Sequence, residues 1–201
     1  MIIARWDPTA FVGRVEVCKG THLDSMGKRG KVDLLYVEEV LFLLEKGRLC
    51  LFMPHSNAVT SIERAWSLLE EAHFSLDSYL VYAALKCSGN VVFRRGEVNY
   101  EGSEVVRTLE DITYDVWAPS SKTKFSRKSP SPPSFHVVVL AENSPYSSTS
   151  ILLRVSHLVT QFNLSIKIAS SKAGLVDFVD ASQPSKPKLL PPESTLSQIS
   201  L

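Results

Sequence analysis

The sequence has few cysteines, no long apolar run and almost no net charge, and each shortage excludes a class of protein. Its three cysteines, Cys18, Cys50 and Cys87, are odd in number and lie far apart. They lack the C-x-x-C spacing of a zinc or redox site, so we expect reduced thiols and no metal centre. No window approaches the roughly 18 consecutive apolar residues of a membrane span. The first ten residues contain two charges and a proline, unlike a secretory signal.

The formal net charge of +1 excludes nucleic-acid binding through overall basicity, so such a role would rest on local patches. The hydrophobic share of 44% and charged share of 21% are typical of a soluble chain with a packed core. The glycine-rich and basic segment Gly27–Lys31 lacks the spacing of a phosphate-binding P-loop, and we interpret it as a solvated loop. The sequence therefore predicts no cofactor.

The first part of the chain predicts a small helix-rich adaptor domain over residues 1–75. Apolar residues recur at helical spacing over Tyr36–Lys46, and Gly47 follows the end of that helix. Leu49–Met53 predicts a short strand, as does the weak alternation of Val15–Cys18. A T-x-x-E capping box that begins at Thr60 predicts the start of a further helix.

The second part, residues 76–181, predicts a mixed sheet flanked by helices. A helix ends before Gly89 and leads directly into a strand at 91–93, which is followed by an exposed loop or hairpin over 97–111. Serine, proline and lysine dominate residues 118–133, which we expect on the surface. The other expected elements are strands at 112–117, 135–140, 164–169 and 175–179, a helix that begins at Ser148 or Thr149, and a disordered tail at 182–201.

Three stretches in this order resemble the larger non-catalytic subunit of the eukaryotic tRNA-splicing endonuclease. They are YVEEVLFLLEKGRLCLF, SLDSYLVYAALKCSGNVVFRR and YDVWAPSSKTKFSRKSPSPPSFHVVVL. The resemblance covers most of residues 11–180. It implies that the second domain has a restriction-endonuclease-like α/β fold.

The resemblance also implies that the chain does not cleave RNA. Catalytic relatives use a tyrosine, a histidine and a lysine to transfer protons and to stabilise a charged phosphorane. The corresponding positions here hold Trp117, residues 132–134 of sequence Pro-Pro-Ser, and residues 162–163 of sequence Phe-Asn. We expect no catalytic residue.

Two alternatives to this structural role stay open. One is an active endonuclease with a displaced site that uses His136 and Lys167, although their positions within strands favour structural roles. The other is a generic protein-interaction module unrelated to tRNA. The resemblance itself implies a heterotetramer with the catalytic and the small non-catalytic subunits, acting on pre-tRNA in the nucleus, with the cytoplasm and a part in mRNA processing as further options.

Two sets of residues are candidates for contacts with these partners. Cations in short clusters are candidates for the RNA backbone, which proteins recognise largely by shape and phosphate. Apolar residues of the last two expected strands are candidates for pairing with another subunit. The RNA candidates are Arg94, Arg95, Lys122, Lys124, Arg127 and Lys128, and the interface candidates are Leu164, Ile166, Ile168, Leu175 and Phe178.

Overall fold

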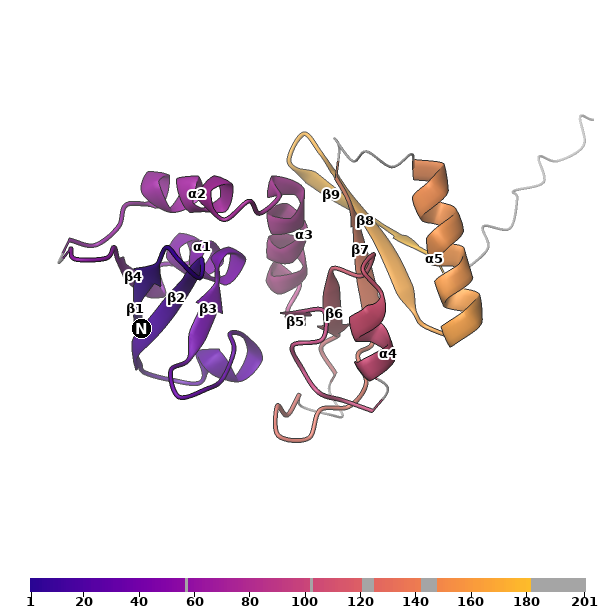
Figure 1. Cartoon of the computed structure of the whole chain (residues 1–201), viewed down its shortest axis with the longest axis horizontal. Coiled ribbons are helices and arrows are strands. Elements are labelled where there is room, and N and C mark those ends of the chain that lie inside the picture. Colours follow the sequence, from indigo (N-terminus) through magenta and orange to yellow (C-terminus); the bar gives the residue numbers. More distant parts are fainter. Residues whose placement is uncertain (57, 102, 121–124, 142–147, 182–201) are drawn as a thin grey trace, which may run out of the picture.

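A computed structural model describes residues 1–56, 58–101, 103–120, 125–141 and 148–181 of the chain (Figure 1). It contains two mixed sheets with helices packed on them, which confirms the expected mixture of helices and sheet. The predicted tail at 182–201 lies outside the described residues. Within the described ranges, no helix is long and apolar enough to cross a membrane.

The first sheet corrects the prediction of a helix-rich unit over residues 1–75. Its strand order is β3-β2-β1-β4. β1 (Ile2–Asp7) pairs antiparallel with β2 (Val12–Cys18) and parallel with β4 (Leu49–Phe52), and β3 (Leu34–Tyr36) pairs antiparallel with β2. This unit therefore contains a four-stranded sheet, and one of its two inner strands, β1, begins at the second residue.

Three helices lie between the first sheet and the second, and α1 packs on the first sheet. α1 (Val37–Glu45) follows β3 directly, and α2 (Ile62–Glu71) and α3 (Leu76–Cys87) come after β4. The cap of α2 is Ser61 rather than the predicted Thr60, because the Ser61 hydroxyl accepts the Arg64 N–H at 3.3 Å.

The end of α3 follows the prediction. Gly89 has a φ of +81°, a conformation that disfavours residues with a Cβ, so it terminates the helix as expected.

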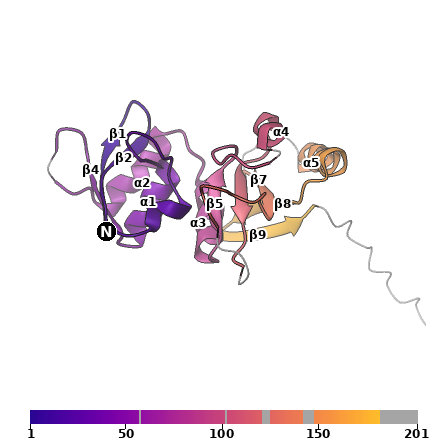
Figure 2. The same ribbon diagram turned by 90° about the horizontal axis from the view of Figure 1, so that it is seen from below.

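The second sheet has the order β5-β6-β7-β8-β9, and only β7 and β8 run parallel. Its strands are β5 (Val91–Arg94), β6 (Tyr114–Trp117), β7 (Phe135–Leu140), β8 (Ile166–Lys172) and β9 (Leu175–Asp180). α5 (Ser148–Phe162) makes the crossover from β7 to β8, as a parallel pair requires. Figure 2 shows α5 and the short α4 (Ser103–Thr108) on one face of this sheet and α3 on the other.

The α4 helix corrects the exposed loop or hairpin predicted for residues 97–111. Val98 and Val106 are buried, so this segment contributes to the core instead of standing in solvent. The expected restriction-endonuclease-like fold stays a prediction.

One hydrophobic cluster runs through both halves of the molecule, the first half being residues 1–75 and the second half residues 76–181. It includes Ile2 and Leu35 of the first sheet, Tyr82 of α3, and Val116 and Val137 of the second sheet. α3 lies between α1 and the second sheet and has core residues in this cluster (Figure 1). The predicted boundary near residue 75 therefore falls inside a continuous core. A second cluster lies under α5.

Candidate functional site

Trp117, which the resemblance aligns with the tyrosine of catalytic relatives, is a packing residue at the end of β6. Its side chain is buried against the rings of Phe93, Tyr100 and Phe125. Its indole N–H donates a hydrogen bond to the Ser131 carbonyl oxygen at 2.8 Å. Indole donates only and has no ionisable hydroxyl, so this residue cannot take the role of a tyrosine acid or base. The Ser131 contact also ties the serine- and proline-rich connection to the sheet.

The two segments that the resemblance aligns with the histidine and the lysine of catalytic relatives meet around one cavity of about 260 Å³. Pro132 and Pro133 line it from the segment before β7, and Asn163 lines it from the segment before β8. The parallel pairing of β7 and β8 places the beginnings of both strands at the same edge of the sheet. The structure thus brings these segments together, but neither contributes a histidine or a lysine at the family's positions.

The same cavity is lined by His136, whose ring is fixed by a buried carboxylate. Its Nδ1 lies 2.8 Å from Oδ1 of Asp115, its cross-strand neighbour on β6, and both side chains are buried. The other oxygen, Oδ2, accepts the Gly96 N–H at 3.1 Å. The pair therefore fixes the pairing of β6 with β7 and the turn after β5, which supports the structural role predicted for His136.

Lys167, the second residue of the alternative active site, lies on the other face of the sheet. In the register of β7 and β8, His136 pairs with Ile166 and Lys167 pairs with Val137. Successive side chains of a strand point to opposite faces, so His136 and Lys167 point away from each other. The Lys167 ammonium lies 4.5 Å from the centroid of the Phe135 ring. The two side chains do not form one site.

Arg94, predicted as an RNA contact, is bound within the protein. Its Nε and Nη2 donate to the two carboxylate oxygens of Glu38 on α1, at 2.6 and 2.5 Å. The guanidinium also lies 4.2 Å from the Tyr36 ring centroid and 4.9 Å from that of Phe74. Glu38 is only 1% exposed, so Arg94 supplies the charge that this buried carboxylate requires. This bidentate pair joins the second sheet to the first half.

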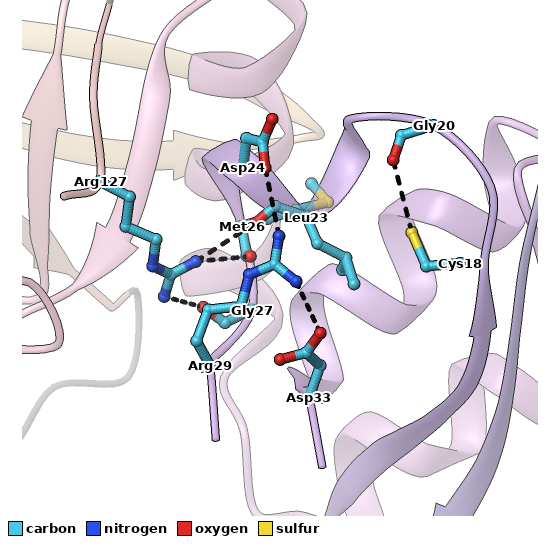
Figure 3. A network of polar contacts seen from close by, with 9 residues as sticks. All are labelled: Cys18, Gly20, Leu23, Asp24, Met26, Gly27, Arg29, Asp33 and Arg127. Atoms are coloured by element: carbon cyan, nitrogen blue, oxygen red, sulfur yellow. Dashed lines mark hydrogen bonds and ion pairs between the residues drawn. The ribbon is translucent and has the colours of Figure 1, made fainter. Parts of the chain in front are cut away.

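Arg127 makes a second connection between the halves (Figure 3). Its Nη1 donates to the carbonyl oxygens of Leu23 at 3.3 Å and Met26 at 2.9 Å, and its Nη2 donates to that of Gly27. Beside it, Arg29 pairs with Asp24 and Asp33 and holds the ends of the same loop together. Gly27, the first residue of the expected solvated loop, thus accepts a hydrogen bond from a cation 100 residues further along the chain, while residues 28–31 are exposed as expected.

The remaining basic candidates differ in their surroundings. Lys128 is exposed, and Lys122 and Lys124 lie outside the described residues. Nη1 of Arg95 is buried and has no hydrogen-bond partner among the described residues. Lys128 is therefore the candidate whose side chain the structure leaves in solvent.

Glu39, next to Glu38 on α1, is a fully buried carboxylate that the sequence did not single out. Its two oxygens accept the backbone N–H groups of Gly27 at 2.6 Å and Tyr36 at 2.8 Å. Burial, and then repulsion by Glu38, raises the pKa of Glu39 to about 7. The hydroxyl of Tyr36 donates to Glu97 of the second half, which adds a further contact across the junction.

The predicted interface residues divide into two groups. Ile166 and Ile168 are buried under α5, and Leu164 packs against the same cluster, so β8 does not offer them to a partner. Leu175 is 74% exposed and Phe178 is also exposed, both on β9, the last strand of the sheet. The interface prediction therefore concerns β9, where Val179 adds a third exposed apolar side chain.

The described residues contain no group of three or more histidine, cysteine, aspartate or glutamate side chains that could hold a metal ion. A search of curated proteins found no match to the chain. Residues 1–53, which form the first sheet and α1, match the family model described as the N-terminal part of the tRNA-splicing endonuclease subunit sen54. For this part of the chain the match confirms the resemblance found in the sequence, and it supports a subunit of the tRNA-splicing endonuclease.

Proposed function

We propose that this chain is a non-catalytic structural subunit of the tRNA-splicing endonuclease, the complex that removes introns from pre-tRNA. The observation that carries the proposal is the match of residues 1–53 to the sen54 N-terminal family. The side chains at the three positions used by catalytic relatives support it, because Trp117, Pro132–Ser134 and Phe162–Asn163 offer no acid, base or cation there. The chain would then act by holding other subunits and the tRNA in place.

A subunit with this task gains from a rigid connection between its two halves. The ion pair of Arg94 with Glu38, the bonds from Arg127 to the Leu23–Gly27 loop, and the continuous core fix the first sheet relative to the second. In our proposal, the first half binds a catalytic subunit and β9 pairs with the small non-catalytic subunit within a heterotetramer. Pre-tRNA binds in the assembled complex, in the nucleus or in the cytoplasm.

Affinity purification of the tagged full chain from cell extract tests this function. We expect recovery of the catalytic and small endonuclease subunits and of endonuclease activity on intron-containing pre-tRNA. A bait that carries Lys substitutions at Leu175 and Val179 should recover fewer small subunits, while Lys at the equally exposed Leu153 of α5 should not change recovery. Purification of the unaltered chain without any endonuclease subunit would refute the proposed function.

A further inference from the structure

A basic cavity lies where the ends of α1 and α3 approach the turn that precedes the Leu23–Gly27 carbonyls. Its volume is about 670 Å³, and its lining includes Thr21, Ser25, Phe42, Lys46, Arg48 and Lys86. None of these residues was a candidate in the sequence, because they come from three separate segments. The cavity is formed only when these three segments pack together.

The polar lining of the basic cavity consists of groups suited to an anion. Lys46, Arg48 and Lys86 bring three positive charges, and the Thr21 and Ser25 hydroxyls can donate hydrogen bonds. No carboxylate lines the cavity, and among the described residues none of these three cations forms an ion pair. An oxyanion that contacts several of these cations would therefore be bound favourably.

Lys86 is held at the wall of the basic cavity by a contact with the backbone. Its side chain is partly buried, and its ammonium donates to the Ser25 carbonyl oxygen at 3.3 Å. Burial lowers the pKa of Lys86, and the nearby carboxylate of Glu39 offsets this only in part, because its two oxygens accept the Gly27 and Tyr36 N–H groups. The Lys86 charge therefore faces the cavity without a directly bonded carboxylate.

The last carbonyls of α1, next to Lys46 and Arg48, are bonded to backbone N–H groups. The carbonyl oxygens of Phe42, Leu43 and Leu44 already accept backbone N–H groups. Among the described residues, neither side chain forms an ion pair, and the Lys46 ammonium lies 5.4 Å from the Phe42 ring centroid.

The size of the basic cavity indicates more than an inorganic ion. Small-molecule sites range from about 300 to 1,000 Å³, and a single phosphate fills only a small part of that volume. Phe42 and Met26 give the cavity an apolar part beside its cations. This combination suits a nucleotide, whose phosphate requires cations and whose base packs against apolar or aromatic groups.

We propose that the basic cavity binds a nucleotide phosphate of an RNA strand through Lys46, Arg48 and Lys86. The choice of RNA as the source of the phosphate rests on the proposed function. A free mononucleotide has the same chemistry, and the experiment below separates the two sources.

The test compares two double variants of the full chain that lose the same charge. Lys46→Gln/Arg48→Gln alters the basic cavity, and Lys31→Gln/Lys172→Gln removes two exposed lysines outside the lining. Fluorescence anisotropy with labelled pre-tRNA at several salt concentrations gives affinity and salt slope. Thermal shifts with inorganic phosphate and with adenosine monophosphate report binding of free ligands, because a ligand specific for the native state stabilises it.

The cavity variant should bind pre-tRNA roughly tenfold more weakly than the control variant, with a salt slope lower by about 2. Equal affinities and slopes would overturn the proposal, as would failure of the unaltered chain to bind any of the three probes. Stabilisation by adenosine monophosphate without any effect on pre-tRNA would overturn RNA as the source. If the affinity purification recovers no endonuclease subunits but the unaltered chain still binds RNA through the basic cavity, the proposed function is refuted and the RNA site in the cavity is supported.

Discussion

At the scale of single residues, the ion pair of Arg94 and Glu38 is the contact whose removal should cost most. Arg94→Ala leaves the carboxylate of Glu38 buried without a partner, and breaking such a pair costs about 3 kcal/mol or more. Urea unfolding measures the change. Arg64→Ala is the matched control, because its pair with Glu71 is exposed and is worth roughly 0–1 kcal/mol. Equal losses in the two variants would contradict a buried link between the halves.

Glu39 makes the stability of the chain depend on pH. With a pKa of about 7 in the folded state and 4.5 as the ordinary value, this group binds more protons in the native state between these limits. The contribution of Glu39 to the unfolding free energy is therefore highest below about pH 4.5. It falls by on the order of 3 kcal/mol as pH rises through 7.

The pH prediction is checked by urea unfolding of the unaltered chain and of Glu39→Gln between pH 5 and pH 8. The variant loses an acceptor for Gly27 or Tyr36 at every pH, so the slope with pH, not the absolute stability, is the readout. The slope should be smaller in Glu39→Gln and unchanged in Glu70→Gln, whose side chain is exposed. A slope that survives in Glu39→Gln would assign the pH dependence to another group.

Residue roles were only partly predictable from the sequence. That Trp117 cannot act as an ionisable tyrosine could be deduced from the sequence, because it depends on residue type alone. The partners of Arg94 and Arg127 could not be deduced, because Glu38 and the Leu23–Gly27 carbonyls are 56 and about a hundred residues away. An arginine beside a turn has the same pattern whether it binds RNA or a buried carboxylate.

At the scale of elements, β9 is the feature best placed to join another subunit. It ends the second sheet, and its exposed apolar residues favour pairing with a strand of a partner. Val179→Lys should lower the affinity for the small subunit roughly tenfold or more, since a charge would enter the interface, with little effect on stability. Leu153→Lys on α5 is the control, since Leu153 is 68% and Val179 62% exposed.

Isothermal titration calorimetry of both lysine variants with the purified small subunit measures this effect. Unchanged affinity of Val179→Lys would exclude β9 as the interface and would direct attention to other surfaces of the chain.

Elements with strong local patterns were predicted well, and elements that depend on distant pairing were not. The bounds expected for α1 and β7, and the end expected for α3, agree with the structure within about two residues, because helical spacing or a continuous apolar run marks them. β1 was missed because its six residues are followed by Pro8 and because its parallel partner, β4, lies more than forty residues away. Residues 97–111 look polar in sequence, yet Val98 and Val106 are buried.

At the scale of the whole molecule, the continuous core predicts that both halves unfold together. Trp6 is buried in the first sheet and Trp117 in the second, so each can report on one half. One variant keeps only Trp6 and another keeps only Trp117, with Phe at the other two tryptophan positions. In each variant, tryptophan fluorescence should show one urea transition whose midpoint agrees with that of far-ultraviolet circular dichroism. A fluorescence transition separate from the circular dichroism transition in either variant would show that the halves unfold independently.

The central claim is that the chain supports RNA cleavage by other subunits and does not cleave RNA itself. Incubation of intron-containing pre-tRNA with the purified chain, alone and after reconstitution with catalytic and small subunits, tests this most directly. We predict no cleavage by the chain alone and intron release by the reconstituted complex, with the same activity when the chain carries His136→Ala in a complex that assembles. Cleavage by the chain alone that is lost in His136→Ala would contradict the structural role.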